Sequence, residues 1–119
     1  METHEKVKIV NRYINAVSNQ DMDAIREIFD EQATVEDPIG TNAHVGMDAI
    51  CKFYEGAFSV GVKLESTGSV RCAGNAAAFP FVARTPSMEI EVIDIFEFNE
   101  KGEIKSMRAY WGPDNCSPL

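Results

Sequence analysis

The chain has 119 residues, a length that suits one domain with one hydrophobic core and is short for two. Its 45% hydrophobic and 25% charged residues are typical of a packed globular protein and exclude a disordered chain, and it has no apolar run of membrane-spanning length. The formal net charge of −8 argues against binding to a phosphate backbone. We therefore expect a single domain over residues 1–119, with no nucleic-acid and no membrane partner.

The three cysteines, Cys51, Cys72 and Cys116, are an odd number and form no Cys-x-x-Cys pair. Neither a disulfide framework nor a zinc site is predicted. The acidic segment 1–5 lacks the basic and then apolar pattern of a secretory signal, so a cytoplasmic location is expected.

Two helices are predicted before residue 31. The first begins at Thr3, a typical N-cap residue, and has Tyr13 on or beside an apolar stripe with three-and-four spacing: Val7, Val10, Ile14 and Val17. The second follows the N-cap candidate Asp21 and ends near Asp30. Its inward residues are Ile25, Ile28 and Phe29.

Residues 33–37 alternate with period two, which predicts a strand with Asp37 on the same face as Val35. Pro38 cannot donate to a sheet and favours an extended Asp37, so the strand should end there. We expect Asp37 at a strand end, followed by a loop through Gly40 to Gly46.

A third helix is predicted after Gly46 from apolar residues at three-and-four spacing: Ile50, Phe53, Tyr54, Ala57 and Phe58. Strands separated by turn signals follow at 62–67, 69–73 and 77–84. A meander is the simplest arrangement of these strands.

The segment 88–98 alternates cleanly and places Asp94 on one face with the apolar residues Met88, Ile90, Val92, Phe96 and Phe98. After a turn at 99–102, a last strand sets Met107, Ala109 and Trp111 on one face. Three helices packed on a curved antiparallel or mixed sheet predict the α+β class.

Two acids, Asp37 and Asp94, thus occupy apolar phases of strands. An ionised carboxylate is costly to bury, so such a group is paired, hydrogen-bonded or kept protonated. Taken singly, Asp37 could be a turn residue, and a bulge could turn Asp94 to solvent. Tyr13 and Tyr54 could be ordinary core residues. Together, the four favour proton transfer in an apolar pocket.

Other chemistries find little support. His4 and His44 lie in polar contexts without metal-ligand spacing, so no metal site is predicted. A Gly-x-Ser-x-Gly elbow and a phosphate-binding glycine loop are both absent from the sequence.

The sequence resembles the bacterial Δ5-3-ketosteroid isomerases over nearly its whole length. The resemblance is carried by Arg12-Tyr13-Ile14, by Asp21 to Ile25, by Ala33-Thr34-Val35-Glu36-Asp37-Pro38-Ile39-Gly40, by Phe53-Tyr54, by Val92-Ile93-Asp94, and by Met107 to Trp111. Any one of these segments alone is weak, but together they are specific.

The resemblance implies a cone-like fold similar to nuclear transport factor 2, a deep apolar pocket, a homodimer, a steroid substrate and no cofactor. It also implies that Asp37 is the general base and that Tyr13 and a protonated Asp94 donate to the substrate's carbonyl oxygen. By the same resemblance, Tyr54 supports Tyr13. The remaining pocket residues would be Phe79, Phe81, Met107 and Trp111.

Two departures from the family are visible. Phe29 stands where close relatives carry a further networked tyrosine, and the hairpin between Phe81 and Asp94 is several residues shorter. Two alternatives stay open. One is another reaction on the same scaffold, such as polyketide cyclisation, dehydration or epoxide hydrolysis. The other is a non-catalytic dimer that binds a hydrophobic ligand or a protein partner.

Overall fold

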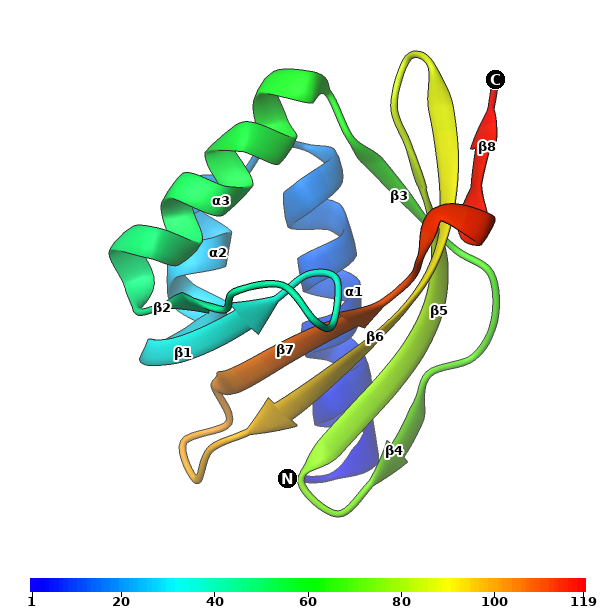
Figure 1. The fold of residues 1–119 in the computed structure, drawn as a ribbon. Coiled ribbons are helices and arrows are strands. Elements are labelled where there is room, and N and C mark those ends of the chain that lie inside the picture. The colour runs from blue at the N-terminus through cyan, green and yellow to red at the C-terminus, as the bar shows by residue number, and fades with distance from the viewer.

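The computed structural model describes all residues from 1 to 119. Three helices, α1 (Thr3–Ser18), α2 (Met22–Ile28) and α3 (Met47–Val60), lie on one side of a sheet (Figure 1). The strands of the sheet are β1 (Phe29–Glu36), β2 (His44–Val45), β3 (Lys63–Ser66), β4 (Arg71–Ala73), β5 (Ala76–Arg84), β6 (Met88–Phe98), β7 (Ile104–Tyr110) and β8 (Cys116–Pro118). A 3₁₀ turn at Pro113–Asn115 precedes the last strand.

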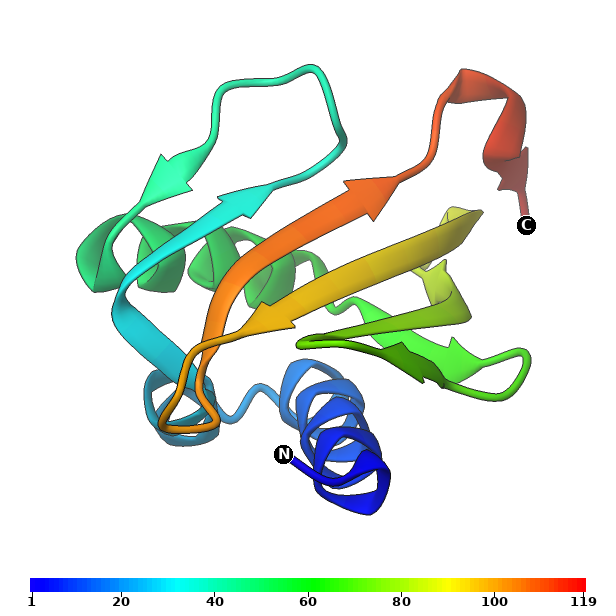
Figure 2. The ribbon, with the colours of Figure 1, turned by 90° about the horizontal axis from the view of Figure 1, so that it is seen from below.

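The sheet has the strand order β2-β1-β7-β6-β5-β3, with β4 paired to β5 and β8 paired to β6. It curves around the helices (Figure 2). The α+β class with an antiparallel or mixed sheet is confirmed. The sheet is mixed, because β1 runs parallel to β7 while the other pairs are antiparallel. Their connection contains α3 and the β3–β6 strands, which is the long crossover that a parallel pair requires.

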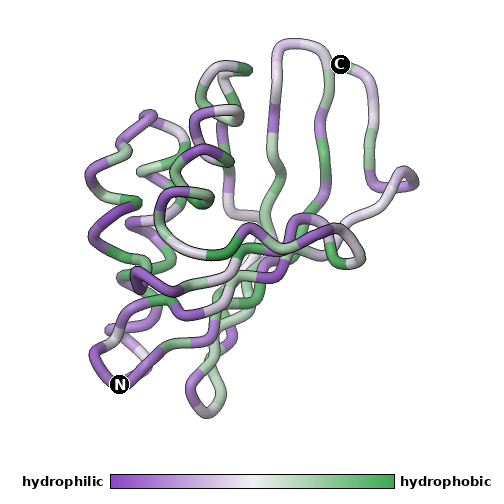
Figure 3. Tube along the Cα trace, turned by 60° about the vertical axis from the view of Figure 1, so that its left-hand side comes forward, coloured by the Kyte–Doolittle hydropathy of each residue, from purple (hydrophilic) through white to green (hydrophobic).

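The two periodicities of the sequence place the core between helices and sheet. Helix α1 buries Val10, Tyr13 and Val17 along one stripe. Strand β6 buries Val92, Asp94, Phe96 and Phe98, so the predicted alternation is confirmed. Hydrophobic and hydrophilic segments alternate along the chain in the same way (Figure 3). The inward phase of each element therefore faces one shared core.

Two predicted helix ends are wrong. Phe29 is not the last inward residue of α2 but the first residue of β1, where it pairs with Ile104 of β7. An apolar residue faces the core in either conformation, so periodicity could not separate them. Helix α1 is capped by Glu2 and not by Thr3, and the Glu2 backbone N–H donates to Glu5 Oε1 at 3.1 Å.

The short elements were also missed. Strand β2 lies within the predicted loop, and β8 follows the last predicted strand. Trp111 lies just beyond the end of β7 and not within it. Residues of the expected strands 62–67 and 69–73 that lie outside Lys63–Ser66 and Arg71–Ala73 belong to no helix, strand or turn. No helix has both the length and the apolar character needed to cross a membrane.

Candidate active site

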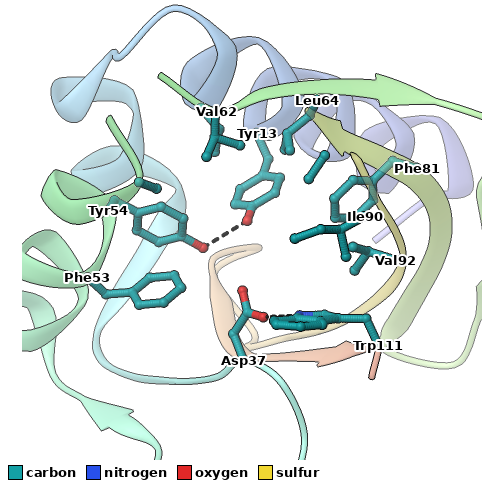
Figure 4. Close-up of a pocket in the computed structure, with 13 residues that line it drawn as sticks. Tyr13, Asp37, Phe53, Tyr54, Val62, Leu64, Phe81, Ile90, Val92 and Trp111 are labelled. Atoms are coloured by element: carbon teal, nitrogen blue, oxygen red, sulfur yellow. Dashed lines mark hydrogen bonds between the residues drawn. The ribbon is translucent and has the colours of Figure 1, made fainter. Parts of the chain in front are cut away.

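A cavity of about 210 Å³ opens between the helices and the inner face of the sheet (Figure 4). Asp37 is the only charged residue in its wall, which otherwise consists of Tyr13, Val17, Phe53, Tyr54, Ala57, Val62, Leu64, Phe81, Ala83, Ile90, Val92 and Trp111. Largely apolar walls with a few polar groups are typical of sites for small molecules. The cavity therefore suits a hydrophobic ligand that has one polar end.

A pair of buried tyrosines forms one polar group of the cavity. The hydroxyl oxygens of Tyr13 and Tyr54 lie 2.9 Å apart and share a hydrogen bond (Figure 4). Burial raises the pKa of both phenols well above the usual value. Both tyrosines are therefore neutral at physiological pH and can act as hydrogen-bond donors.

The tyrosines come from two different helices and are held by aromatic packing. Tyr13 lies between Val10 and Val17 on the buried stripe of α1, and Tyr54 lies on the stripe of α3. The ring of Phe96 packs edge to face on Tyr13 at a centroid distance of 5.0 Å. Fixed rings hold the hydroxyl groups in place before a ligand enters, which is the condition for a preorganised donor site.

Asp37 is placed by the end of β1. Pro38 ends the strand, and the next residue, Ile39, donates its backbone N–H to Ala109 O of β7 at 2.8 Å. This contact brings Asp37 beside Trp111, whose Nε1–H donates to Asp37 Oδ1 at 2.7 Å. The second carboxylate oxygen points into the cavity, toward the tyrosine pair (Figure 4).

Burial raises the pKa of the Asp37 carboxyl, while the hydrogen bond from Trp111 and the charge of His44 lower it. A carboxylate with a raised pKa is a stronger base than one in water, and the Trp111 bond leaves its other oxygen free to take a proton. Asp37 therefore has the properties of a general base in this cavity.

Asp94 is the second unusual acid. It is 1% exposed and lies in β6 between its sheet partners Phe79 and Ala109. Neither of its side-chain oxygens has a hydrogen-bond partner. Burial, together with the charge of Asp37, raises the pKa of Asp94 well above the usual range, so the acid is held neutral. The structure confirms the inward orientation predicted from the strand alternation.

Five of the eight residues selected from the sequence line the cavity: Tyr13, Asp37, Tyr54, Phe81 and Trp111. Phe79 and Met107 pack in the core at 1% and 0% exposure and, like Asp94, are not part of the cavity wall. Sequence periodicity placed Phe53, Ile90 and Val92 on apolar phases without assigning them to a pocket, and it gave no face for Val62 and Leu64. Strand alternation over 88–98 was the available signal for Ile90 and Val92.

The arrangement combines a carboxylate of raised pKa, neutral hydrogen-bond donors and largely apolar walls. Donors fixed in a low-dielectric site stabilise negative charge that develops on an oxygen more than they stabilise a neutral oxygen. No three His, Cys, Asp or Glu side chains come together in a way that could hold a metal ion. The residues present suit proton transfer at a carbon or oxygen next to a polar group.

Comparison with known proteins agrees with this geometry. Residues 10–107 match the SnoaL-like domain family. A protein named steroid Delta-isomerase from Nocardioides simplex is 36% identical over 108 residues, which cover 87% of each chain. A solved structure, described for the role of the epoxide hydrolase/cyclase-like enzyme SalBIII in pyran ring formation in the polyether salinomycin, superposes with a TM-score of 0.93. It is 28% identical and the match covers 99% of this chain and 98% of that one. The chain therefore belongs to the SnoaL-like domain family and has the fold of the nuclear transport factor 2-like superfamily.

Proposed function

We propose that this protein is a steroid Δ-isomerase, which moves the double bond of a 3-oxo-Δ5-steroid into conjugation at the Δ4 position without a cofactor. The observation that carries the proposal is the free oxygen of Asp37, directed across an apolar cavity toward the Tyr13–Tyr54 pair. The 36% identical relative that is named a steroid Delta-isomerase supports the choice of substrate.

The proton moves through Asp37. Its carboxylate takes a proton from carbon 4 of the steroid, and the C–H electrons pass into a dienolate with negative charge on the 3-oxygen. The protonated Asp37 then returns the proton to carbon 6, so the base is regenerated and no redox change occurs. The Trp111 N–H bond to Oδ1 holds the carboxylate in one orientation throughout.

The dienolate oxygen is stabilised by Tyr13 and Asp94. When Tyr54 donates to the Tyr13 oxygen, the Tyr13 O–H is free to donate to the substrate. The neutral Asp94 has an O–H donor and no partner within the protein. Asp94 lies behind the cavity wall, so this donation requires the substrate oxygen to pass the wall beside Tyr13. The contact would give the buried, unpartnered acid its hydrogen bond.

The test is a cofactor-free assay with 5-androstene-3,17-dione, followed through the ultraviolet absorbance of the conjugated enone. We expect turnover by the wild type and a loss of about 10²- to 10⁴-fold in kcat for Asp37→Asn, which removes the base and keeps the shape. Glu55→Gln, an exposed carboxylate next to Tyr54, is the matched control and should retain full activity. Equal rates for Asp37→Asn and wild type would remove the base assignment.

A second candidate is an epoxide-opening cyclase, favoured by the TM-score of 0.93 to the SalBIII structure. In that reaction the neutral Asp94 would protonate the epoxide oxygen, while Asp37 would take the proton of the attacking hydroxyl group. Turnover of a hydroxy-epoxide with no isomerisation of the steroid would select this function. Tight binding of a phenolic steroid with neither reaction would select the non-catalytic alternative.

We also propose that the protein is a homodimer. The outer face of the sheet exposes Ile93 at 49% and Tyr110 at 43%, and these two residues are paired across β6 and β7. Sedimentation equilibrium should give twice the chain mass of 13.2 kDa. The variant Ile93→Glu should give the monomer mass, because a charge on this face opposes burial.

A further inference from the structure

His44 is a histidine beside the cavity with no place in the mechanism above. It lies in β2 opposite Val35 of β1, two residues before Asp37 on the same inward phase. The side chain is half-buried and takes part in none of the five ion pairs of the structure. His44 is therefore directed to the same side of β1 as the base.

Phe53 connects His44 to the cavity. The imidazole packs against the Phe53 ring at a centroid distance of 4.7 Å and an interplanar angle of 38°. Phe53 in turn lines the cavity, as Asp37 does (Figure 4). The aromatic ring holds the imidazole outside the cavity wall, where it does not occupy space that a ligand needs.

We propose that His44 is a positioning residue for the base: its positive charge, held behind Phe53, keeps the Asp37 carboxylate ionised within an apolar wall. A cation near a carboxylate favours the ionised form of that carboxylate, so the His44 charge opposes the effect of burial on Asp37. The inference rests on the proposed function, in which Asp37 is the base. The effect of the His44 charge on the ionisation of Asp37 can nevertheless be measured without turnover.

The charges around Asp37 support this role. Burial raises the pKa of the Asp37 carboxyl, and the charge of His44 acts in the opposite direction, together with the Trp111 hydrogen bond. Trp111 supplies a neutral N–H donor, so His44 is the only charged group that favours the ionised form of Asp37 in this environment.

Other charged groups near β2 are turned away from the cavity. Glu36, the neighbour of Asp37 in β1, is on the opposite phase of the strand and accepts a bond from the Gly40 N–H. On α3, which also packs against β2, Asp48, Lys52 and Glu55 are all exposed. The three side chains of α3 are screened by water, whereas His44 is half-buried behind the cavity wall.

Asp37 must be ionised to act as a base, and this requirement sets the direction in which loss of the His44 charge changes the activity. A cation favours the carboxylate form, so its removal shifts ionisation of Asp37 to higher pH. The acidic limb of the kcat/KM profile reports this ionisation in the free enzyme. Loss of the His44 charge should therefore reduce activity on the acidic limb and leave the plateau near its wild-type level.

The experiment compares pH profiles of His44→Gln and His44→Arg with that of the wild type. In His44→Gln we expect the acidic limb at higher pH, with kcat/KM on the limb lower by about two- to fivefold, the factor contributed by charge pairs of this exposure. His44→Arg keeps a permanent charge and should keep the wild-type limb. His4→Gln, an exposed histidine on α1, is the matched control and should leave the profile unchanged.

A second measurement makes the test independent of turnover. In protein labelled with ¹³C at aspartate carboxyl carbons, the Asp37 resonance is assigned with Asp37→Asn and titrated in each His44 variant. A midpoint that rises in His44→Gln but not in His44→Arg supports the inference. An unchanged midpoint in His44→Gln overturns it, and an equal rise in both variants shows that packing, not charge, is responsible. A shifted midpoint without steroid turnover would refute the isomerase proposal alone.

Discussion

Replacing Asp94 with asparagine should make the protein more stable at neutral pH. Asp94 is 1% exposed and neither oxygen is hydrogen-bonded, so the folded state holds the acid in its neutral form. In the unfolded chain an aspartate ionises near pH 3.9, as in model peptides. Unfolding at higher pH therefore releases a proton, which favours the unfolded wild type.

The proton that Asp94 releases on unfolding sets the size and the sign of the stability difference between wild type and Asp94→Asn. Since the folded pKa of Asp94 is raised, its stability contribution is fully present below about pH 3.9 and is lost as the pH rises toward the folded pKa. Within this window the wild type loses about 1.4 kcal/mol per pH unit relative to Asp94→Asn. Near pH 4 the two proteins should agree to within about 1 kcal/mol, because a neutral acid and an amide are equally short of partners.

Urea unfolding at a series of pH values between 4 and 8, followed by far-ultraviolet circular dichroism, measures the difference directly. Glu91→Gln, on the same strand but exposed, is the control and should show no comparable change with pH. A stability difference between wild type and Asp94→Asn that stays constant with pH would refute the reasoning. It would mean that Asp94 is as well solvated in the folded protein as in the unfolded chain.

Three further outcomes are expected. Tyr13→Phe should lower kcat for the steroid by about 10²- to 10³-fold, since it removes one oxyanion donor, and a wild-type kcat would exclude that role. Trp111→Phe removes the N–H bond that lowers the pKa of Asp37, so the acidic limb of the kcat/KM profile should move to higher pH, and an unmoved limb would contradict the bond. Phe96→Ala should cost about 3 to 5 kcal/mol in chemical denaturation, because this ring is 0% exposed and packs on Tyr13; a smaller loss would indicate a core that can collapse.

The helices and the inward phase of each long strand were predictable because their periods are local. Val10, Tyr13 and Val17 recur at helical spacing, and Val92, Asp94 and Phe96 recur at strand spacing, in the sequence and in the structure alike. The ends were less predictable. The Phe29 side chain can reach the core from a helix or from a strand. Its strand conformation is set by pairing with Ile104, which lies 75 positions further along the chain.

The candidate site was likewise predictable only in part. Alternation placed Met107 on an inward face, and the family resemblance added Phe79 and Phe81. Neither signal contains information on depth, so the sequence could not show that only Phe81 of the three lines the cavity. The hydrogen bond between Trp111 and Asp37 joins residues 74 positions apart. His44 lies in a polar loop segment, where no period marks it as a neighbour of the cavity.

The sequence by itself therefore determined which residues face inward, that two acids lie among them, and which family the chain resembles. These properties depend on side-chain order along a helix or strand, where the geometry repeats every few residues. Only the tertiary structure decided that β1 runs parallel to β7, that Asp37 receives the Trp111 N–H, and that Asp94 is left without a partner. Such contacts join segments far apart in the chain, and packing of the whole domain sets their distances.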